Sequence, residues 1–309
     1  MIVGFLLSNA VFGQTAASMR FEAASIKPVV NWPPAGAVAG GERGTGGGCP
    51  TSMKVDPGRV DFQCATLAML IGYAFRISPD RVTGPDWMMA VGSPRFNIAA
   101  TIPQGGSNNQ VPEMVQALLA ERFNLIVHRG TADREIYGLV VARGGLKVKE
   151  VAPQGAAAAN ADSAEAVDAF YGATLSRVVP GAPGSEAAAI LSNPRMGTVL
   201  QTGDPFRMQR WEAPDITMAG LADLLDHVAP LPSPVTDLTG RGGRYQLVLE
   251  VSLKDLRPGQ RREGMADFEA KVIDAFNDGL AKLGLRLERR RGRVENIFVD
   301  RVEKSPTDN

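Results

Sequence analysis

The sequence predicts an α+β protein made of two similar domains, and two repeated patterns predict it. The first pattern is an arginine before an aromatic residue at the head of an alternating strand, at Arg95 and again at Arg244. The second is a threonine that precedes an amphipathic helix, at Thr66 and at Thr217, 29 and 27 residues before those arginines. Because order, spacing and apolar face all recur, we interpret the chain as one plan used twice.

The first half is expected to contain a strand, a helix, a strand, a helix and two further strands. Apolar residues alternate in the strands and recur at i, i+3, i+4 and i+7 in the first helix, which begins after a good capping residue. The last two strands are expected to form a hairpin. The elements are strands at residues 59–63, 95–102, 123–128 and 136–142, and helices beginning at Thr66 and Pro112.

The second half repeats this order, so each copy has the plan β-α-β-α-β-β, with two helices on a small mixed sheet. The basic run at residues 288–293 is interpreted as a solvated hairpin turn rather than a phosphate-binding patch. The elements are strands at residues 208–212, 244–251, 283–288 and 293–302, a helix after Thr217, and a helix carrying Val272, Ala275, Phe276 and Leu280.

Composition divides the chain into four segments. Residues 1–19 are interpreted as a signal peptide and tail, and residues 20–150 as the first α+β domain. Residues 151–206, rich in Ala, Gly, Ser and Pro, are expected to be a linker with one loose helix over 163–170. Residues 207–305 form the expected second domain.

The N-terminal apolar stretch, residues 2–13, is too short to span a bilayer but suits the apolar core of a signal peptide. A basic segment before it is missing, and a buried N-terminal strand is the alternative. The two cysteines, Cys49 and Cys64, could close a disulfide worth about 3 kcal/mol in an exported protein. The alternative is two independent thiols. We expect a periplasmic or extracellular protein.

Charge and composition exclude some classes of function. Lys+Arg and Asp+Glu are equal at 33 each, which removes the electrostatic argument for a nucleic-acid partner. Two cysteines and two distant histidines do not have the usual spacing of a zinc site, so we expect no metal and no cofactor. The glycine run at residues 44–48 lacks the Lys and the helix start that a phosphate-binding loop needs.

The catalytic candidates are few. His128 could be a general base oriented by Asp133 or Glu135, although a partly exposed strand histidine without a catalytic role is the favoured interpretation. His227, at the end of the helix after Thr217, is expected to bring a cation to the helix C-terminus.

Trp87, Arg95 and Arg244 are candidates for binding, each with a structural alternative. Trp87 follows a turn, where it would either plug a core or offer a contact surface, and Trp211 has the same two interpretations. Arg95 and Arg244 recur at equivalent strand heads, which favours a structural role in which each pairs with a carboxylate or covers the strand end.

Five segments together resemble a protein family. They are residues 21–28 (FEAASIKP), 83–87 (TGPDW), 95–100 (RFNIAA), 118–129 (LLAERFNLIVHR) and 235–245 (VTDLTGRGGRY). They resemble the soil-associated proteins of unknown function that are abundant in Acidobacteria. This resemblance implies an extracytoplasmic sensing or interaction role, because related domains are fused to membrane-bound sensor peptidases of the antibiotic-response type. Each half also resembles, by pattern alone, the short N-terminal domain of secretins and TonB-dependent receptors.

These observations favour binding over catalysis. The leading hypothesis is a non-catalytic binding or sensing module of the cell envelope, whose partner is an envelope protein or a small ligand and which is not an integral membrane protein. Exposed sheet edges could accept a partner strand. The alternatives are a hydrolase that uses His128 as base, and a structural component of a secretion or receptor assembly.

Overall fold

The computed structural model describes residues 19–30, 49–152, 167–169, 175–179, 188–193, 195–204, 207–254 and 265–307. The expected signal peptide and the glycine run at residues 44–48 therefore lie outside the described residues, apart from Met19. The fold is mixed α+β, as predicted. Its elements are β1 (Ala23–Pro28), β2 (Ser52–Asp56), β3 (Arg59–Thr66), α1 (Leu67–Phe75), η1 (Pro79–Arg81), β4 (Val82–Thr83), α2 (Asp86–Met89), β5 (Arg95–Thr101), η2 (Asn108–Gln110), α3 (Val111–Phe123), β6 (Ile126–Val141), β7 (Lys149–Val151), β8 (Val167–Ala169), β9 (Leu175–Val179), β10 (Ala188–Asn193), β11 (Gly197–Asp204), β12 (Met208–Thr217), α4 (Met218–Val228), β13 (Val235–Asp237), β14 (Arg244–Ser252), α5 (Met265–Lys282) and β15 (Leu285–Arg301).

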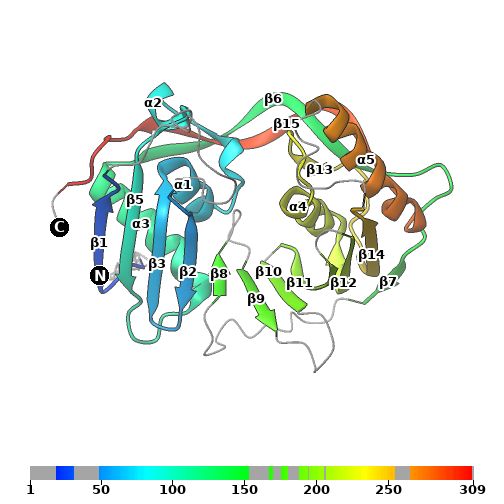
Figure 1. The fold of residues 1–309 in the computed structure, drawn as a ribbon, viewed down its shortest axis with the longest axis horizontal. Coiled ribbons are helices and arrows are strands. Elements are labelled where there is room, and N and C mark those ends of the chain that lie inside the picture. Colours follow the sequence, from blue (N-terminus) through cyan, green and yellow to red (C-terminus); the bar gives the residue numbers. More distant parts are fainter. Residues whose placement is uncertain are drawn as a thin grey trace, which may run out of the picture.

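The molecule has two lobes (Figure 1). Lobe 1 contains β1 to β5 with α1 to α3, and lobe 2 contains β11 to β14 and β7 with α4 and α5. One sheet passes through both lobes in the order β1-β5-β3-β2-β8-β9-β10-β11-β12-β14-β7. A second sheet, β13-β6-β15-β4, joins the lobes along the opposite side (Figure 1).

Both lobes begin with the same strand–helix junction. The Thr66 hydroxyl accepts a hydrogen bond from the Met69 N–H and begins α1, and the Thr217 hydroxyl accepts one from the Gly220 N–H and begins α4. The register of β3 on β5 shifts just before Thr66, and that of β12 on β14 shifts just before Thr217. After each shift the threonine lies opposite the predicted strand-head arginine, Arg95 or Arg244. The two lobes therefore share element order, cap and strand irregularity.

Each lobe has its own apolar core on the helix side of the sheet. In lobe 1, Leu70 and Ile71 of α1 are fully buried, and the rings of Phe62 and Tyr73 meet edge to face at 5.3 Å. In lobe 2 the alternate residues of β14 and the inner face of α4 are buried in the same way. Burying each large aliphatic side chain stabilises the fold by about 1.5–3 kcal/mol.

The two predicted hairpins are wrong. Residues 126–141 form one continuous strand, β6, and residues 285–301 form another, β15, and the two pair antiparallel along almost their whole length. The basic run at residues 288–293, predicted to be a turn, lies inside β15. Opposite charges on the paired strands meet across the ladder, as in the ion pairs Arg129–Glu295 and Arg289–Glu135, so long-range pairing replaces the local turn.

This ribbon exchanges residues between the lobes. The second half of β15 pairs with β4 and buries Ile297 in the core of lobe 1. The second half of β6 pairs with β13 and buries Tyr137 and Leu139 in the core of lobe 2. A boundary between residues 150 and 207 therefore does not separate the two cores, because each lobe is completed by a strand from the other half of the chain.

The segment predicted to be a linker, residues 151–206, is in strands over most of the residues that the structure describes. Strands β8, β9 and β10 pair in succession and carry the sheet from β2 to β11. The loose helix predicted over residues 163–170 is a strand at Val167–Ala169, and its other residues lie outside the described ones. Antiparallel pairing on both sides gives this stretch backbone partners that its composition did not reveal.

Candidate functional site

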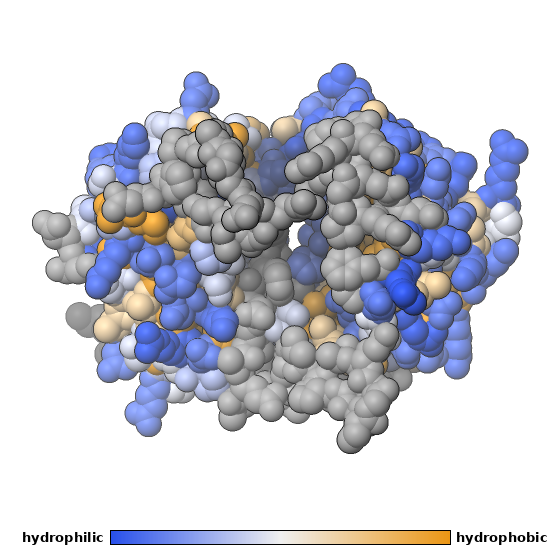
Figure 2. All heavy atoms as spheres, viewed as in Figure 1, coloured by the Kyte–Doolittle hydropathy of each residue, from blue (hydrophilic) through white to orange (hydrophobic). Residues whose placement is uncertain are grey.

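A groove lies where β12, β14 and α5 meet in lobe 2. It consists of two adjoining hollows of about 570 and 510 Å³, which share Met208 and Glu250 as lining residues. The first lies toward β11 and Arg210, and the second lies between β14 and α5. Hydrophilic side chains cover the outer margin of this lobe (Figure 2). Below we call these two hollows the groove.

Helix α5 supplies one wall through its spacing. Four charged residues of the helix lie three or four positions apart and therefore share one face, with two carboxylates between two lysines. They are Lys271, Asp274, Asp278 and Lys282. The opposite face carries the buried apolar residues Val272, Phe276 and Leu280 that fix the helix on the sheet. An amphipathic helix thus presents a charged row to the groove.

Gly279 sets the distance between this wall and β14. A Cβ atom at this position would overlap the carbonyl oxygen of Glu250 and come within 3.0 Å of the Leu249 side chain. Only glycine lets the helix backbone approach the strand so closely. In lobe 1 the corresponding edge of β5 is instead paired along its length with β1, from Phe96 to Thr101.

Arg210 organises the charges on the sheet side of the groove. Its guanidinium donates to Glu212 at 2.8 Å and to Glu250 at 2.5 Å, and these two hydrogen bonds raise the pKa of Arg210. Glu250 also lies 3.8 Å from the Lys282 ammonium. Both cations keep over a third of their side-chain surface exposed. The groove therefore offers cations and carboxylates side by side to a polar or zwitterionic ligand.

Sequence reasoning missed this groove. The charged row on α5 could be found from its i, i+3 and i+4 spacing, but a charged helix face is usually only a solvated surface. This helix face becomes one side of a groove because Arg210 on β12 and Glu250 on β14 form the other side. These two residues are 40 positions apart in the chain. In the part of the chain that the structure describes, no cluster of three or more His, Cys, Asp or Glu could hold a metal ion.

The structure does not bring His128 and Asp133 together. The two residues are five apart in the extended strand β6 and point to opposite faces, and Asp133 lies opposite Arg293. The His128 Nδ1 atom lies 2.9 Å from the Asp300 carboxylate, and its ring stacks on Phe298 with centroids 5.2 Å apart. The side chain is 59% exposed. The predicted orienting groups were therefore wrong, since the partner comes from β15.

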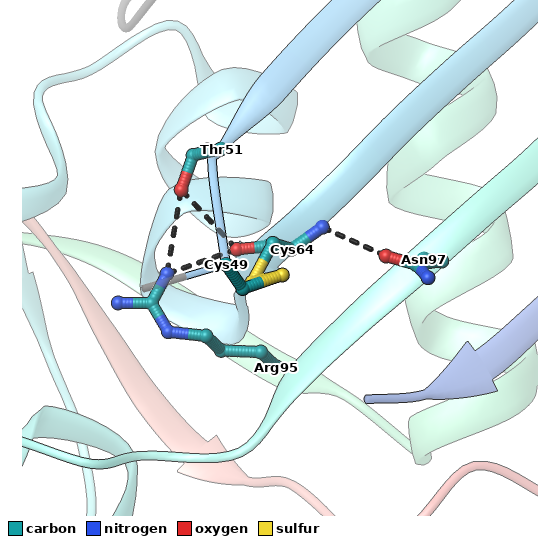
Figure 3. Close-up of a disulfide and its surroundings, with 5 residues drawn as sticks. All are labelled: Cys49, Thr51, Cys64, Arg95 and Asn97. Carbon is teal, nitrogen blue, oxygen red and sulfur yellow. Dashed lines mark hydrogen bonds between the residues drawn. A yellow bond between two sulfur atoms is a disulfide. The ribbon is translucent and has the colours of Figure 1, made fainter. Parts of the chain in front are cut away.

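The predicted disulfide is present and lies at the strand irregularity of lobe 1 (Figure 3). Cys64, bonded to Cys49, has a left-handed backbone with φ of 55°. Arg95 donates to the Cys64 carbonyl at 2.9 Å and to the Thr51 hydroxyl at 3.3 Å. The Cys64 N–H donates to the Asn97 side-chain oxygen at 2.8 Å. Arg95 therefore anchors the backbone here.

Arg244 does the same for lobe 2 with a carboxylate. Its guanidinium pairs with the Asp215 side chain and donates to the Asp215 carbonyl at 3.3 Å. Asp215 stands two residues before the capping threonine, as Cys64 does in lobe 1. Both arginines thus bind the same backbone position, which gives them the structural role that the repetition suggested.

The two tryptophans considered as contact residues, Trp87 and Trp211, differ in burial. Trp211 is 2% exposed and its ring stacks on Phe276 with centroids 6.2 Å apart, so it fills the core of lobe 2. Trp87, in the short helix α2, is half-buried against the core of lobe 1. His227 is half-buried on α4, and burial lowers its pKa. Burial therefore disfavours the cation that we expected at this helix end.

Comparison with known proteins places the chain in a family. A family model described as a protein of unknown function (DUF3738) matches residues 68–302, which is most of the chain, and the chain belongs to that family. A stretch of 96 residues is 43% identical to an octanoyltransferase of Chelativorans sp. (strain BNC1), and it covers 29% of this chain and 36% of that protein. The chain thus spans about a third of that relative's length. No solved structure matches. Among the described residues, no helix is long and apolar enough to cross a membrane.

Proposed function

We propose that this protein is a non-catalytic, extracytoplasmic binding or sensing module of the cell envelope, and that the groove is its ligand site. The groove carries the proposal, because it is a hollow lined by exposed cations and carboxylates that are held by a sheet on one side and a helix on the other. Rigid elements on both sides pre-organise such a site. The partner would be an envelope protein segment or a small polar ligand.

The disulfide between Cys49 and Cys64 supports the compartment, because disulfides persist in oxidising environments outside the cytoplasm. The apolar stretch at residues 2–13 supports export. The resemblance to soil-associated proteins, whose relatives are fused to membrane-bound sensor peptidases, supports a sensing role in the envelope.

We also infer that the two lobes arose from one duplicated unit. Equivalent caps, equivalent register shifts and equivalent arginine–backbone contacts support this inference, and none of them is required for a stable α+β fold. Helices α3 and α5 are also each followed by a left-handed residue before the ribbon, Asn124 and Gly284.

The test of the groove is site-specific photo-crosslinking in intact cells. A photoreactive phenylalanine analogue replaces Lys282 in the groove, and a matched variant carries it at exposed Lys54 on β2 of lobe 1. We expect a discrete adduct from position 282 that is weaker when Asp274 and Asp278 are replaced by Ala. Equal adducts from both positions would contradict a groove-specific partner.

The test of the compartment uses the natural signal. A fusion of alkaline phosphatase after residue 309 is active only where its own disulfides form, so we expect active enzyme in the periplasmic fraction. A matched fusion that lacks residues 1–19 is expected to be inactive. Equal activity of the two fusions would contradict export by this segment.

A further inference from the structure

Strand β14 has a backbone edge that β7 covers only in part. β7 pairs with β14 from Arg244 to Gln246, and beyond these residues helix α5 lies beside the same edge. The Glu250 carbonyl points to this edge, because a Cβ atom at Gly279 of α5 would overlap its oxygen. The edge of β14 after Gln246 is therefore turned toward the helix.

Ser252 continues this edge into the second hollow of the groove, between β14 and α5. Backbone N–H and C=O groups of alternate residues point to the same side of a strand, so those of Ser252 point the same way as those of Glu250. As this alternation requires, the Leu253 N–H points to the other side and donates to the Arg207 carbonyl at 2.7 Å. Among the residues that the structure describes, none bonds to the Ser252 N–H or C=O. The hollow therefore contains an unused donor and acceptor of a strand edge.

The hollow ends where α5 meets β14. Gly279 lies against Glu250, two residues before Ser252, so a further strand beside Ser252 has no space to continue past Glu250. The volume of this hollow, about 510 Å³, lies within the range of about 300–1,000 Å³ that is usual for ligand pockets. It therefore fits the end of an extended chain better than the middle of one.

The carboxylates on the α5 side of the hollow have no cation of their own. Asp274 and Asp278 are one turn apart and both are exposed. Neither forms an ion pair or a hydrogen bond with a residue that the structure describes. Asp278 directly precedes Gly279, so negative charge lies near the closed end of the hollow, where a bound chain would have to end.

Two of the three lysines that line the hollow are already paired. Lys271 lies 2.9 Å from Asp267, and Lys282 lies 3.8 Å from Glu250. Lys254, which follows β14, has no ion pair among the described residues. Two carboxylates and one ammonium group thus remain for a ligand, and this balance favours a cationic group on the ligand.

We propose, on the basis of the function proposed for the groove, that the hollow between β14 and α5 binds the end of an extended peptide that carries an ammonium group. The peptide backbone pairs with the free edge at Ser252, and the ammonium group lies between Asp274 and Asp278. Pairing with a strand edge supplies main-chain hydrogen bonds, and charge-assisted hydrogen bonds to the carboxylates add specificity. The ammonium group is either the free N-terminus of the peptide or the side chain of a lysine at its end, because both are protonated at neutral pH.

Peptide capture by the full-length, oxidised protein tests this proposal. The probes are three mixtures of hexapeptides that are randomised without Lys and Arg after the first residue. The first mixture has a free N-terminal Ala, the second an acetylated Ala, and the third an acetylated Lys. Retention on the immobilised protein is measured by mass spectrometry. We expect the acetylated Ala mixture to be retained about tenfold less than at least one of the other two, because it lacks the ammonium group. The better retained of those two identifies the source of that group.

Two sets of variants locate the binding. The double variant Asp274→Asn and Asp278→Asn is expected to lose the tenfold preference. The matched control, Glu113→Gln with Glu121→Gln, removes two exposed carboxylates from α3 of lobe 1 and is expected to keep it. Ser252→Pro removes the edge N–H and is expected to lower the retention of every mixture, whereas Ser252→Ala keeps this N–H and should retain them all. Circular dichroism melts establish which variants fold.

Several results would overturn the proposal. They are equal retention of the three mixtures, retention of none, an unchanged preference in the double Asn variant, and full retention by a folded Ser252→Pro variant. If Ser252→Pro does not fold, the exposed Asp274 and Asp278 pair decides. Any of these results together with a discrete photo-crosslinked adduct from position 282 would leave the groove as the site of another class of ligand. Without that adduct, the function proposed for the groove fails as well.

Discussion

Both lobes have a strand irregularity before their first helix, and different chemical groups hold it in place in each lobe. Two residues before each capping threonine the strand irregularity needs an anchor, and an arginine binds the backbone carbonyl there in both lobes. Lobe 1 adds a disulfide at Cys64, whereas lobe 2 adds the Asp215 carboxylate. The backbone arrangement therefore fixes where an anchor is needed, and either a covalent bond or an ion pair can provide it.

The lobes also differ at the outer edge of the sheet. In lobe 1, strand β1 pairs with β5, while in lobe 2, β7 pairs only with Arg244–Gln246 and Gly279 of α5 lies against the next part of β14. A helix that covers an edge protects it from unwanted strand pairing. It also leaves the groove between α5 and β14, so among the residues that the structure describes the candidate ligand site lies in lobe 2. We expected that a partner strand could pair with an exposed sheet edge. At Glu250 of β14 the backbone of α5 hinders such pairing.

Separating the two halves of the chain is expected to have the largest effect. A fragment of residues 19–152 lacks Ile297 of its core and exposes Tyr137 and Leu139, so we expect it not to fold as a monomer. Mixing it with a fragment of residues 167–309 is expected to restore the native circular dichroism spectrum. A cooperative thermal transition of the monomeric first fragment alone, shown together with light scattering, would contradict the exchange of strands.

The tryptophans separate core from surface. Trp211→Ala is expected to cost about 3–5 kcal/mol of unfolding free energy, because it leaves a cavity against Phe276. Trp87→Ala is expected to cost less than about 2 kcal/mol, because the side chain is only half-buried. Urea denaturation measures both, and a larger cost at Trp87 would show that α2 belongs to the core.

The disulfide of lobe 1 is expected to stabilise the fold at least as much as the Asp215 carboxylate of lobe 2. Replacing both Cys49 and Cys64 with Ala is expected to lower the free energy of unfolding by about 3 kcal/mol, because the open chain gains conformational freedom. Asp215→Ala is expected to cost about 1–3 kcal/mol, because it leaves the Arg244 guanidinium without its carboxylate. Guanidinium denaturation of the oxidised proteins measures both costs. A larger loss of unfolding free energy in Asp215→Ala than in the double Cys variant would show that the disulfide contributes less to stability than the ion pair.

Gly279→Ala tests the approach of α5 to β14. The added methyl group meets the Glu250 carbonyl, so we expect a loss of about 1–3 kcal/mol in spite of the better helix propensity of Ala. Gly242→Ala has open space around the added atom and is expected to change stability by less than about 0.5 kcal/mol. Thermal melts of the two variants decide the matter, and equal melting temperatures would argue against close packing.

The smallest effect is expected at His128. Its pairing with Asp300 is exposed, and such pairs contribute about 0–1 kcal/mol. His128→Gln should therefore leave the unfolding free energy nearly unchanged, with any difference reduced in 1 M salt. A cost of several kcal/mol that persists in high salt would assign this histidine a structural role that its exposure does not suggest.

Much of the local structure could be predicted from the sequence. A helix cap and the start of a strand depend on neighbours within a few residues. The helix starts at Thr66 and Thr217 and the strand starts at Arg95 and Arg244 could therefore be predicted. The groove could not be predicted, because it needs α5, β12 and β14 in contact. The partner of His128 could not be predicted either, since Asp300 is 172 residues away.

The class of fold, the repeated order of elements and the place of each core face follow from local patterns in the amino-acid sequence, because periodicity and capping act over one or two turns of chain. The opening of the expected hairpins into two long strands that cross between the lobes follows instead from contacts between distant parts of the chain. The reason is that the residue pattern of a strand shows which of its faces is apolar but does not show which strand pairs with it. That choice depends on backbone hydrogen bonds and charge pairs formed across the whole molecule.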